Sequence, residues 1–85
     1  MQIFLSDDAL AVEATMNDRD YNKLWDVLEF IAADLEAART DPRNRFISSR
    51  NEWGTHIPGT RYTAFWFAND AIRVTLIADE TLTEH

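Results

Sequence analysis

The sequence predicts a single α+β domain over residues 1–85: a short N-terminal strand, two helices, and a small antiparallel sheet with the helices packed on one face. Two changes of pattern carry this prediction. Apolar residues recur at helical spacing between Tyr21 and Leu35, whereas apolar and polar residues alternate from Arg45 onward. The third observation is composition, since 85 residues with 46% apolar content and no cysteine provide one core without disulfides.

The N-terminal segment predicts a strand followed by a short helix. The strand is expected over Gln2 to Leu5, because β-favouring Ile3 and Phe4 precede an abrupt polar stretch. Ser6 is expected to cap a helix over Asp7 to Met16, since an acidic first turn suits the helix dipole.

A longer second helix carries the clearest periodic pattern. Asn17 or Asp18 is expected to cap it, and Thr40-Asp41-Pro42 to end it, because the residue before proline avoids helical conformation. Its apolar face comprises Tyr21, Leu24, Trp25, Leu28, Ile31, Ala32 and Leu35. Its opposite face is acidic and carries Asp26, Glu29, Asp34 and Glu36.

Strands are expected beyond Pro42. Their ranges are Arg45–Arg50, Trp53–Ile57, Thr60–Ala68 and Ala71–Ala78. Asn69-Asp70 suits a tight two-residue turn, which would place Ala68 opposite Ala71. On the core face this register pairs Phe67 with Ile72, Phe65 with Val74 and Thr63 with Leu76. On the other, partly exposed face it pairs Trp66 with Arg73 and Tyr62 with Ile77.

The ends of the chain predict no targeting signal. The first apolar run, Ile3 to Leu5, is far shorter than a signal peptide or a membrane span, so we expect a cytoplasmic protein without membrane contact. Residues 79–85 lack periodicity and are expected to form a flexible tail.

The charge is unevenly distributed along the chain. Fifteen acidic and eight basic residues give a net charge of -7, which disfavours a general nucleic-acid binder. Residues 1–42 hold ten acidic and three basic residues, whereas residues 43–78 hold five arginines and two acids. The sequence therefore has an acidic half and an arginine-only basic half, and such asymmetry indicates which surface meets which partner.

Several kinds of chemistry lack the residues that they need. His56 and His85 have no metal-ligand spacing and no cysteine companion, and no glycine-rich phosphate loop is present. Ser48 and Ser49 lack the context of a catalytic nucleophile. We therefore expect no metal, no cofactor and no serine-hydrolase chemistry.

Arginine and aromatic residues of the sheet remain as candidates. They are Arg45, Arg50, Trp53, His56, Arg61, Tyr62, Trp66 and Arg73. Guanidinium forks and aromatic faces together can hold phosphates and stack bases. A structural explanation stays open beside this one, in which Arg73 covers Trp66 as a cation–π pair while Arg43 and Arg45 balance the acidic helix.

The motifs of the second half resemble the RelE/ParE superfamily of toxins from type II toxin–antitoxin systems. The resemblance rests on the element order, the Asp41-Pro42 break, the stretch from Trp53 to Tyr62 (WGTHIPGTRY) and the Asn69-Asp70 hairpin, and it spans nearly the whole chain. It implies either ribosome-dependent mRNA cleavage or gyrase poisoning without nuclease chemistry.

In the nuclease version, the resemblance assigns a role to each candidate. Arg61 would stabilise the scissile phosphate, Arg50 would contact neighbouring backbone, and Tyr62 or His56 would act as acid or base. The resemblance also implies a protein partner, an antitoxin-like chain laid over the sheet or into a helix groove.

Two function hypotheses follow. In the first, a toxin-like protein binds its cellular target through the arginine and aromatic sheet surface, with Trp53, Trp66 and Arg73 as contacts. In the second, a non-enzymatic immunity or inhibitor protein docks on a basic partner through Asp26 and Glu29 of the acidic helix. Exposed Tyr62 and Trp66 could also form a dimer contact.

Overall fold

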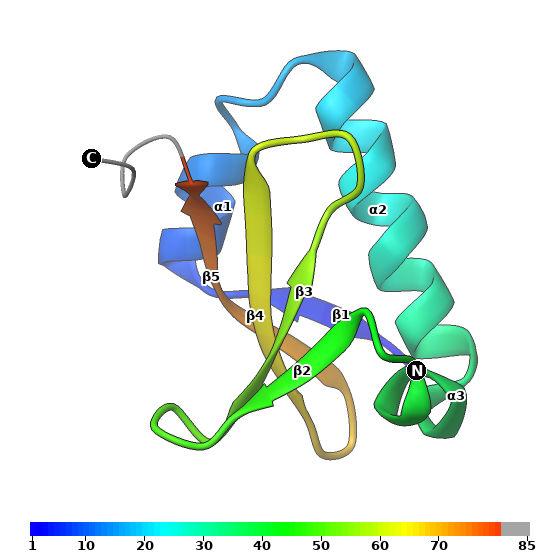
Figure 1. Ribbon diagram of the computed structural model, residues 1–85. Helices are drawn as coiled ribbons and strands as arrows, with labels where there is room; N and C mark the ends of the chain where they lie inside the picture. Colours follow the sequence, from blue (N-terminus) through cyan, green and yellow to red (C-terminus); the bar gives the residue numbers. More distant parts are fainter. Residues whose placement is uncertain (81–85) are drawn as a thin grey trace.

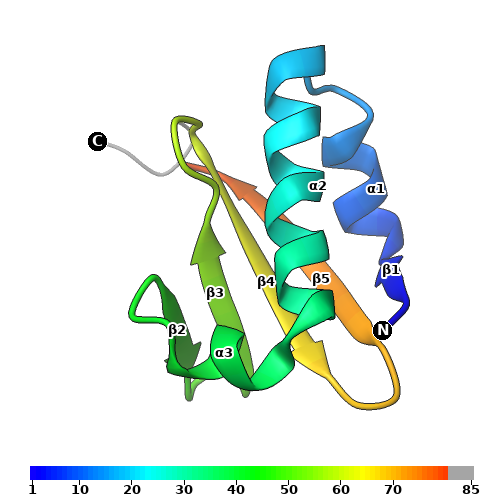
Figure 2. The ribbon, with the colours of Figure 1, turned by 90° about the vertical axis from the view of Figure 1, so that its right-hand side faces the viewer.

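Five strands and three helices make up residues 1–80, the part of the chain described by this computed structural model (Figure 1). They are β1 (Ile3–Leu5), α1 (Asp7–Glu13), α2 (Asp18–Ala33), α3 (Leu35–Thr40), β2 (Asn44–Ile47), β3 (Glu52–His56), β4 (Tyr62–Ala68) and β5 (Ile72–Asp79). The helices lie on one side of the sheet, as the side view in Figure 2 shows. The α+β prediction is therefore confirmed.

The sheet contains both parallel and antiparallel strand pairs, because the first described strand, β1, lies beside the last one, β5. The strand order is β1-β5-β4-β3-β2. The four later strands pair antiparallel, whereas β1 pairs parallel with β5 and places Ile3 beside Ile72. The antiparallel strands were expected from the alternating pattern, but the parallel addition of β1 was not.

The helix caps follow the side-chain chemistry that the sequence indicates. Ser6 Oγ accepts a hydrogen bond from the Ala9 amide at 3.1 Å, and Asn17 Oδ1 accepts one from the Asp20 amide at 2.8 Å. The expected long second helix is interrupted at Asp34, whose extended backbone ends α2 and whose carboxylate accepts from Ala37 to begin α3. Aspartate competes with helical hydrogen bonding in this way, so one predicted helix becomes two.

The predicted hairpin register is wrong. Residues 69–71 form the loop, so Ala68 pairs with Ile72 and Trp66 with Val74, and an irregularity at Phe65/Trp66 then shifts the remaining pairs by one more residue. Side chains alternate along a strand, so a one-residue slip exchanges the two faces. Trp66 is consequently 0% exposed and Tyr62 only 2% exposed, whereas Phe65 lies on the opposite face of the sheet.

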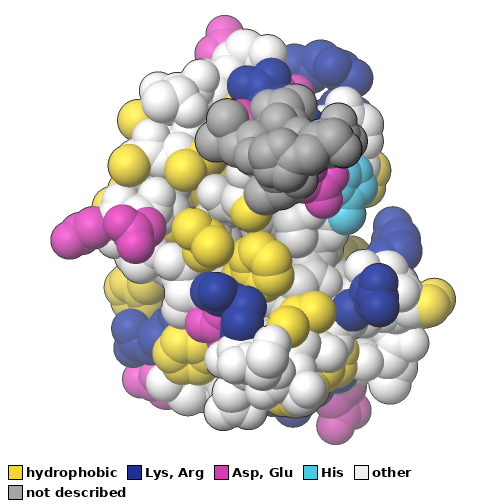
Figure 3. All heavy atoms as spheres, turned by 60° about the vertical axis from the view of Figure 1, so that its left-hand side comes forward, with side chains coloured by type: hydrophobic (Ala, Val, Ile, Leu, Met, Phe, Trp, Pro, Cys, Tyr) yellow, Lys and Arg dark blue, Asp and Glu magenta, His cyan; other side chains and the backbone are white. Residues whose placement is uncertain are grey.

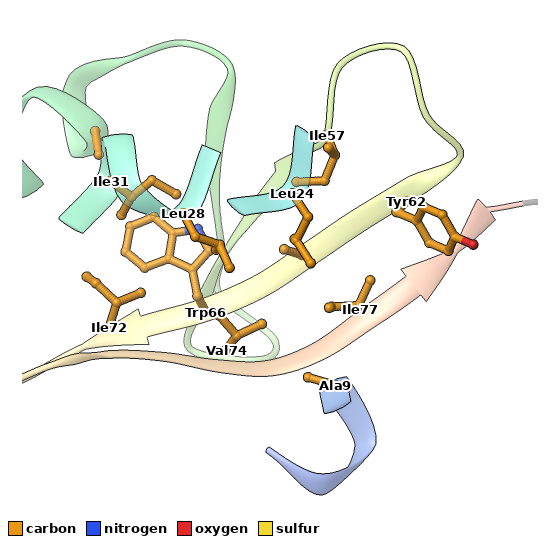
Figure 4. Close-up of a cluster of buried hydrophobic side chains, with 12 residues drawn as sticks. Ala9, Leu24, Leu28, Ile31, Ile57, Tyr62, Trp66, Ile72, Val74 and Ile77 are labelled. Carbon is orange, nitrogen blue, oxygen red and sulfur yellow. The ribbon is translucent and has the colours of Figure 1, made fainter. Parts of the chain in front are cut away.

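The core lies between α2 and the helix-covered face of the sheet. The Trp66 indole projects from β4 towards Leu28 and Ile31 of α2 (Figure 4). The other fully buried apolar side chains around it include Ala9, Leu24, Ile57, Ile72, Val74 and Ile77. Burying each large aliphatic or aromatic side chain contributes about 1.5–3 kcal/mol, so this cluster is the main source of stability.

A chain of buried hydrogen bonds runs along one edge of the core. Trp66 Nε1 donates to Thr55 Oγ1 at 2.9 Å, and Thr55 Oγ1 donates to Asn44 Oδ1 at 2.6 Å. Asn44 Nδ2 completes the chain by donating to the Ala38 carbonyl at 2.7 Å. Polar groups at these positions stay satisfied without water, and the bonds join α3 to strands β2, β3 and β4.

The first two residues of the predicted tail, Asp79 and Glu80, are joined to the sheet. Asp79 is the last residue of β5, and the Glu80 amide donates to the Arg61 carbonyl at 2.7 Å. Residues 81–85 of the predicted tail lie outside the described residues. Within residues 1–80, no helix is long and apolar enough to cross a membrane.

Candidate functional site

Arg61 and Tyr62 lie next to each other at the start of β4, and both side chains already have hydrogen-bond partners within the protein. Arg61 Nε donates to Asp79 Oδ2 at 2.9 Å, and this hydrogen bond raises the pKa of Arg61. Arg61 Nη2 donates to the Tyr62 hydroxyl at 3.0 Å. Because the Tyr62 ring is buried and its hydroxyl already accepts a hydrogen bond from Arg61, a substrate has little access to this hydroxyl.

Arg50 lies in the turn just before β3, and His56 is the last residue of that strand. Arg50 Nε donates to Glu52 Oε1 at 3.0 Å, and its guanidinium lies 4.7 Å from the Phe65 ring centroid. His56 Nδ1 lies 3.5 Å from Glu80 Oε2, near the end of the sheet that carries Arg61. The structure thus groups His56 with Arg61 and Tyr62 but separates Arg50 from all three by the length of a five-residue strand.

The aromatic contacts predicted for partner binding are divided between the core and the surface. Trp66 is buried, and half-buried Trp53 stacks on it with ring centroids 5.9 Å apart. The expected Arg73–Trp66 pair is wrong, because Arg73 lies opposite Phe67 and its guanidinium covers the Phe4 ring at 5.2 Å. A dimer contact through exposed Tyr62 and Trp66 is likewise excluded by their burial.

Carboxylates neutralise most of the arginines that follow Pro42. The ion pairs are Arg43–Asp41, Arg50–Glu52, Arg61–Asp79 and Arg73–Asp70. Arg45 is the exception among the described arginines of this half. On the side of the molecule seen in Figure 3, basic and acidic side chains accordingly lie next to each other among hydrophobic ones. The predicted basic face is therefore close to neutral at short range.

The acidic face of α2 has the opposite character. Asp18, Asp26 and Glu29 are exposed on the side of the helix away from Leu24 and Leu28. Among residues 1–80 no ion pair involves any of these three carboxylates. We call Asp18, Asp26 and Glu29 the acidic stripe.

Exposed aromatic side chains flank this stripe. Tyr21 is 43% exposed and Phe30 48% exposed, although both lie in the same helix as the buried core residues. The stripe and its flanks therefore place uncompensated negative charge beside exposed aromatic side chains, and aromatic residues are enriched in protein–protein interfaces.

A surface cavity of about 210 Å³ opens beside the acidic stripe, between α2 and the edge of the sheet. Asp26, Phe30 and His56 line it, and Val27 and Ile31 supply apolar wall. Sequence reasoning identified the acidic residues from their helical spacing but missed the cavity, because its walls come from segments about 30 residues apart.

Arg43 borders the same cavity and fixes Asp41. The Arg43 guanidinium and backbone amide donate to the Asp41 carboxylate at 2.6–3.1 Å, and these hydrogen bonds lower the pKa of that carboxyl. Arg43 also lies 6.0 Å from the Phe30 ring centroid. Asp41 is thus held charged by Arg43, and Asp26 is the carboxylate of this cavity without an ion-pair partner within residues 1–80.

Two searches, one for metal-ligand groups among the described residues and one for similar proteins, found no match. Within residues 1–80, no group of three or more potential ligand side chains could hold a metal ion. The relationship to RelE/ParE toxins stays a prediction that rests on the sequence motifs alone. Compared with known proteins, the chain matches no family model, no curated protein and no solved structure.

Proposed function

We propose that this protein is a non-enzymatic interaction protein that docks a basic protein partner through the acidic stripe of α2. The observation that carries the proposal is the contrast in charge pairing. Asp18, Asp26 and Glu29 have no ion-pair partners among the described residues, whereas four arginines of the second half each have one. The electrostatic field near the acidic stripe is therefore negative.

Charge and shape would act at different stages of docking. Unpaired carboxylates attract a cationic surface over roughly one Debye length, about 8 Å at physiological salt, and so raise the association rate. Once in contact, exposed Phe30 and the cavity beside Asp26 offer apolar surface to an anchoring side chain. A basic partner with an apolar anchor fits both properties.

The test is a comparison of two double variants with equal net charge. Asp26→Asn/Glu29→Gln removes two charges from the stripe, and Asp7→Asn/Asp8→Asn removes two from the first turn of α1. A synthetic helical peptide rich in lysine and leucine serves as the probe, and stopped-flow mixing at low and physiological salt gives its association rate. We expect the stripe variant to associate about tenfold more slowly than the control variant. Equal rates for the two variants would show that only the net charge matters.

A second candidate keeps the toxin-like function but without nuclease chemistry. Its support is the sheet face away from the helices, where Arg50 covers Phe65 and Arg73 covers Phe4. Such pairs form an amphipathic surface on which a target or an antitoxin-like chain could lie. Induced expression in a bacterial host tests this candidate: it predicts growth arrest that Arg50→Ala/Arg73→Ala relieves. Normal growth at high expression of the wild-type protein would rule it out.

A further inference from the structure

We infer that the free edge of strand β2 binds an extended acidic segment of a protein partner, which joins the sheet as a further strand. β2 is the last strand in the order β1-β5-β4-β3-β2, so only one of its two sides is paired among the described strands. Figure 2 shows β2 at the left-hand edge of the sheet, with no helix or described strand beyond it. This edge is separate from the acidic stripe, so the inference does not rest on the proposed function.

The backbone of β2 leaves hydrogen-bonding groups at this edge. The Asn44 amide donates to the Asp41 carbonyl at 3.0 Å and therefore points away from β3. In an antiparallel pair, alternate residues hydrogen-bond to the neighbouring strand, so Arg45 and Ile47 bond to β3. The N–H and C=O of Phe46 then point outward, where an added strand can pair with them.

The pairing of β3 leads to the same result independently. The Ile57 amide donates to the Tyr62 carbonyl at 3.0 Å, so it points towards the β4 side of the sheet. By the same alternation Gly54 points towards β2, where it lies opposite Arg45. Arg45 is thus a hydrogen-bonded residue of the β2–β3 ladder, and its neighbour Phe46 is not.

Two arginines near this edge have no counter-charge. Residues 39–52 include four arginines and two acids. Both acids are in ion pairs, which are Arg43–Asp41 and Arg50–Glu52. Arg39 and Arg45 are exposed and form no ion pair within residues 1–80. The charge at the edge therefore favours a partner segment with acidic side chains.

These two arginines lie on opposite faces of the sheet. Asn44 Nδ2 donates to the Ala38 carbonyl of α3, so the side chains of Asn44 and Phe46 lie on the helix-covered face. Arg39 lines the same surface cavity as Phe46, whereas Arg45 projects from the face away from the helices. Successive side chains of an added strand also alternate between the faces, so neighbouring acidic residues can approach one arginine each.

Phe46 provides an apolar contact at the edge. Its side chain is 50% exposed, and its ring meets Trp53 edge to face with centroids 5.5 Å apart. A branched apolar side chain opposite Phe46 on the added strand would cover this ring, as cross-strand pairs do within sheets. A second copy of β2 fits the edge less well, because edge-to-edge pairing would bring the arginines of both copies together.

A short capped peptide that alternates glutamate and valine tests the inference, with the matching peptide of lysine and valine as its control. Nuclear magnetic resonance of the isotope-labelled protein follows the amides of Arg45 and Phe46. We expect saturable shifts with the acidic peptide and at least about tenfold weaker binding of the basic one. At saturation, the Phe46 amide should exchange with solvent about tenfold more slowly, because its N–H gains an acceptor. The Arg45 amide should change less, since it already donates to β3.

Three outcomes would overturn the inference. The first is the absence of saturable binding of the acidic peptide. The second is binding that leaves the exchange rate of the Phe46 amide unchanged, because side-chain contact alone would explain it. The third is slower exchange of this amide on concentrating the protein without peptide, which would assign the edge to a second copy of the chain.

Variants of equal charge separate the edge from the net charge of the protein. Arg45→Glu reverses an edge cation, and Arg19→Glu is the matched control, because Arg19 is an exposed residue in the first turn of α2. We expect Arg45→Glu to weaken binding of the acidic peptide at least about tenfold more than Arg19→Glu does. Arg39→Glu gives the same comparison from the helix-covered face. Circular dichroism confirms that each variant is folded, and equal losses in the edge and control variants would contradict an edge site.

Discussion

Thr55→Val tests how much the buried hydrogen-bond chain stabilises the fold, because valine keeps the branched shape of threonine and removes only its hydroxyl. Thr55 is 4% exposed, and its Oγ1 accepts from Trp66 Nε1 and donates to Asn44 Oδ1. The substitution therefore leaves one indole donor and one amide acceptor without their protein partner. Each buried group that loses its partner costs about 1–3 kcal/mol.

The expected magnitude follows from the exposure of each group. Trp66 is 0% exposed, so its indole N–H gains no solvent contact and takes the upper part of that range. Asn44 is 9% exposed, so water reaches its amide more readily and the lower part applies. Burying a methyl in place of the hydroxyl offsets roughly 1 kcal/mol. The free energy of unfolding should fall by about 2–3 kcal/mol, a large share of the ~4–13 kcal/mol that is typical for 85 residues.

Urea unfolding followed by far-ultraviolet circular dichroism measures this loss, since tryptophan fluorescence would itself respond to the changed Trp66 environment. Thr40→Val is the control: this exposed hydroxyl donates only to the carbonyls of Glu36 and Ala37, and its loss should change stability by less than about 0.5 kcal/mol. In a Trp66→Phe background, which has no indole N–H, Thr55→Val should cost about 2 kcal/mol less. A Thr55→Val loss no greater than that of Thr40→Val would refute the reasoning.

Three further predictions concern the core, a turn and an ion pair. Trp66→Ala should lower the free energy of unfolding by about 3–5 kcal/mol and Arg73→Ala by less than about 0.5 kcal/mol in the same urea assay, and similar losses would contradict the observed register. Gly59→Ala should cost about 1 kcal/mol and lower the Tm by roughly 5 °C in a calorimetric scan, because Gly59 has φ +74°, while the nearest group to a new Cβ is the mobile end of Lys23; an unchanged Tm would argue against that backbone conformation. Asp41→Asn should be less stable than the wild type at neutral pH, and this difference should vanish as the pH falls below 3.8, since a carboxyl with a lowered pKa stabilises the fold only while it is ionised. A difference that persists in acid would assign the effect to something other than charge.

Local side-chain chemistry made several elements predictable. Ser6 and Asn17 accept hydrogen bonds at the starts of the helices that they were expected to cap, and α3 ends at Thr40 before the Asp41-Pro42 break. The exposed positions of Asp26 and Glu29 also follow directly from the period of the helix. Each of these features depends on residues within a few positions of one another, so one segment contains all the information.

Register and cavities depend on distant residues, and the sequence alone could not specify them. The Asn69 side chain accepts from the Ala71 amide at 3.1 Å, which draws Ala71 into the loop and moves every later pair. That shift decides whether Trp66 or Phe65 enters the core, and hence which aromatic residues remain for binding. The ion partners of Arg50 and Arg61 are visible only after folding, so a face that looks basic in sequence becomes nearly neutral in the structure.

The parallel pairing of β1 with β5 imposes an order of events on the newly made chain. Ile3 lies beside Ile72, the Ile72 amide donates to the Gln2 carbonyl at 2.9 Å, and the Ser6 amide donates to the Val74 carbonyl at 2.9 Å. β1 can therefore join the sheet only after β5, about 70 residues later in the sequence, has been made. Among the described strands, β5 is thus the template on which β1 docks, and the apolar side chains of β1 lack this sheet neighbour until β5 is available.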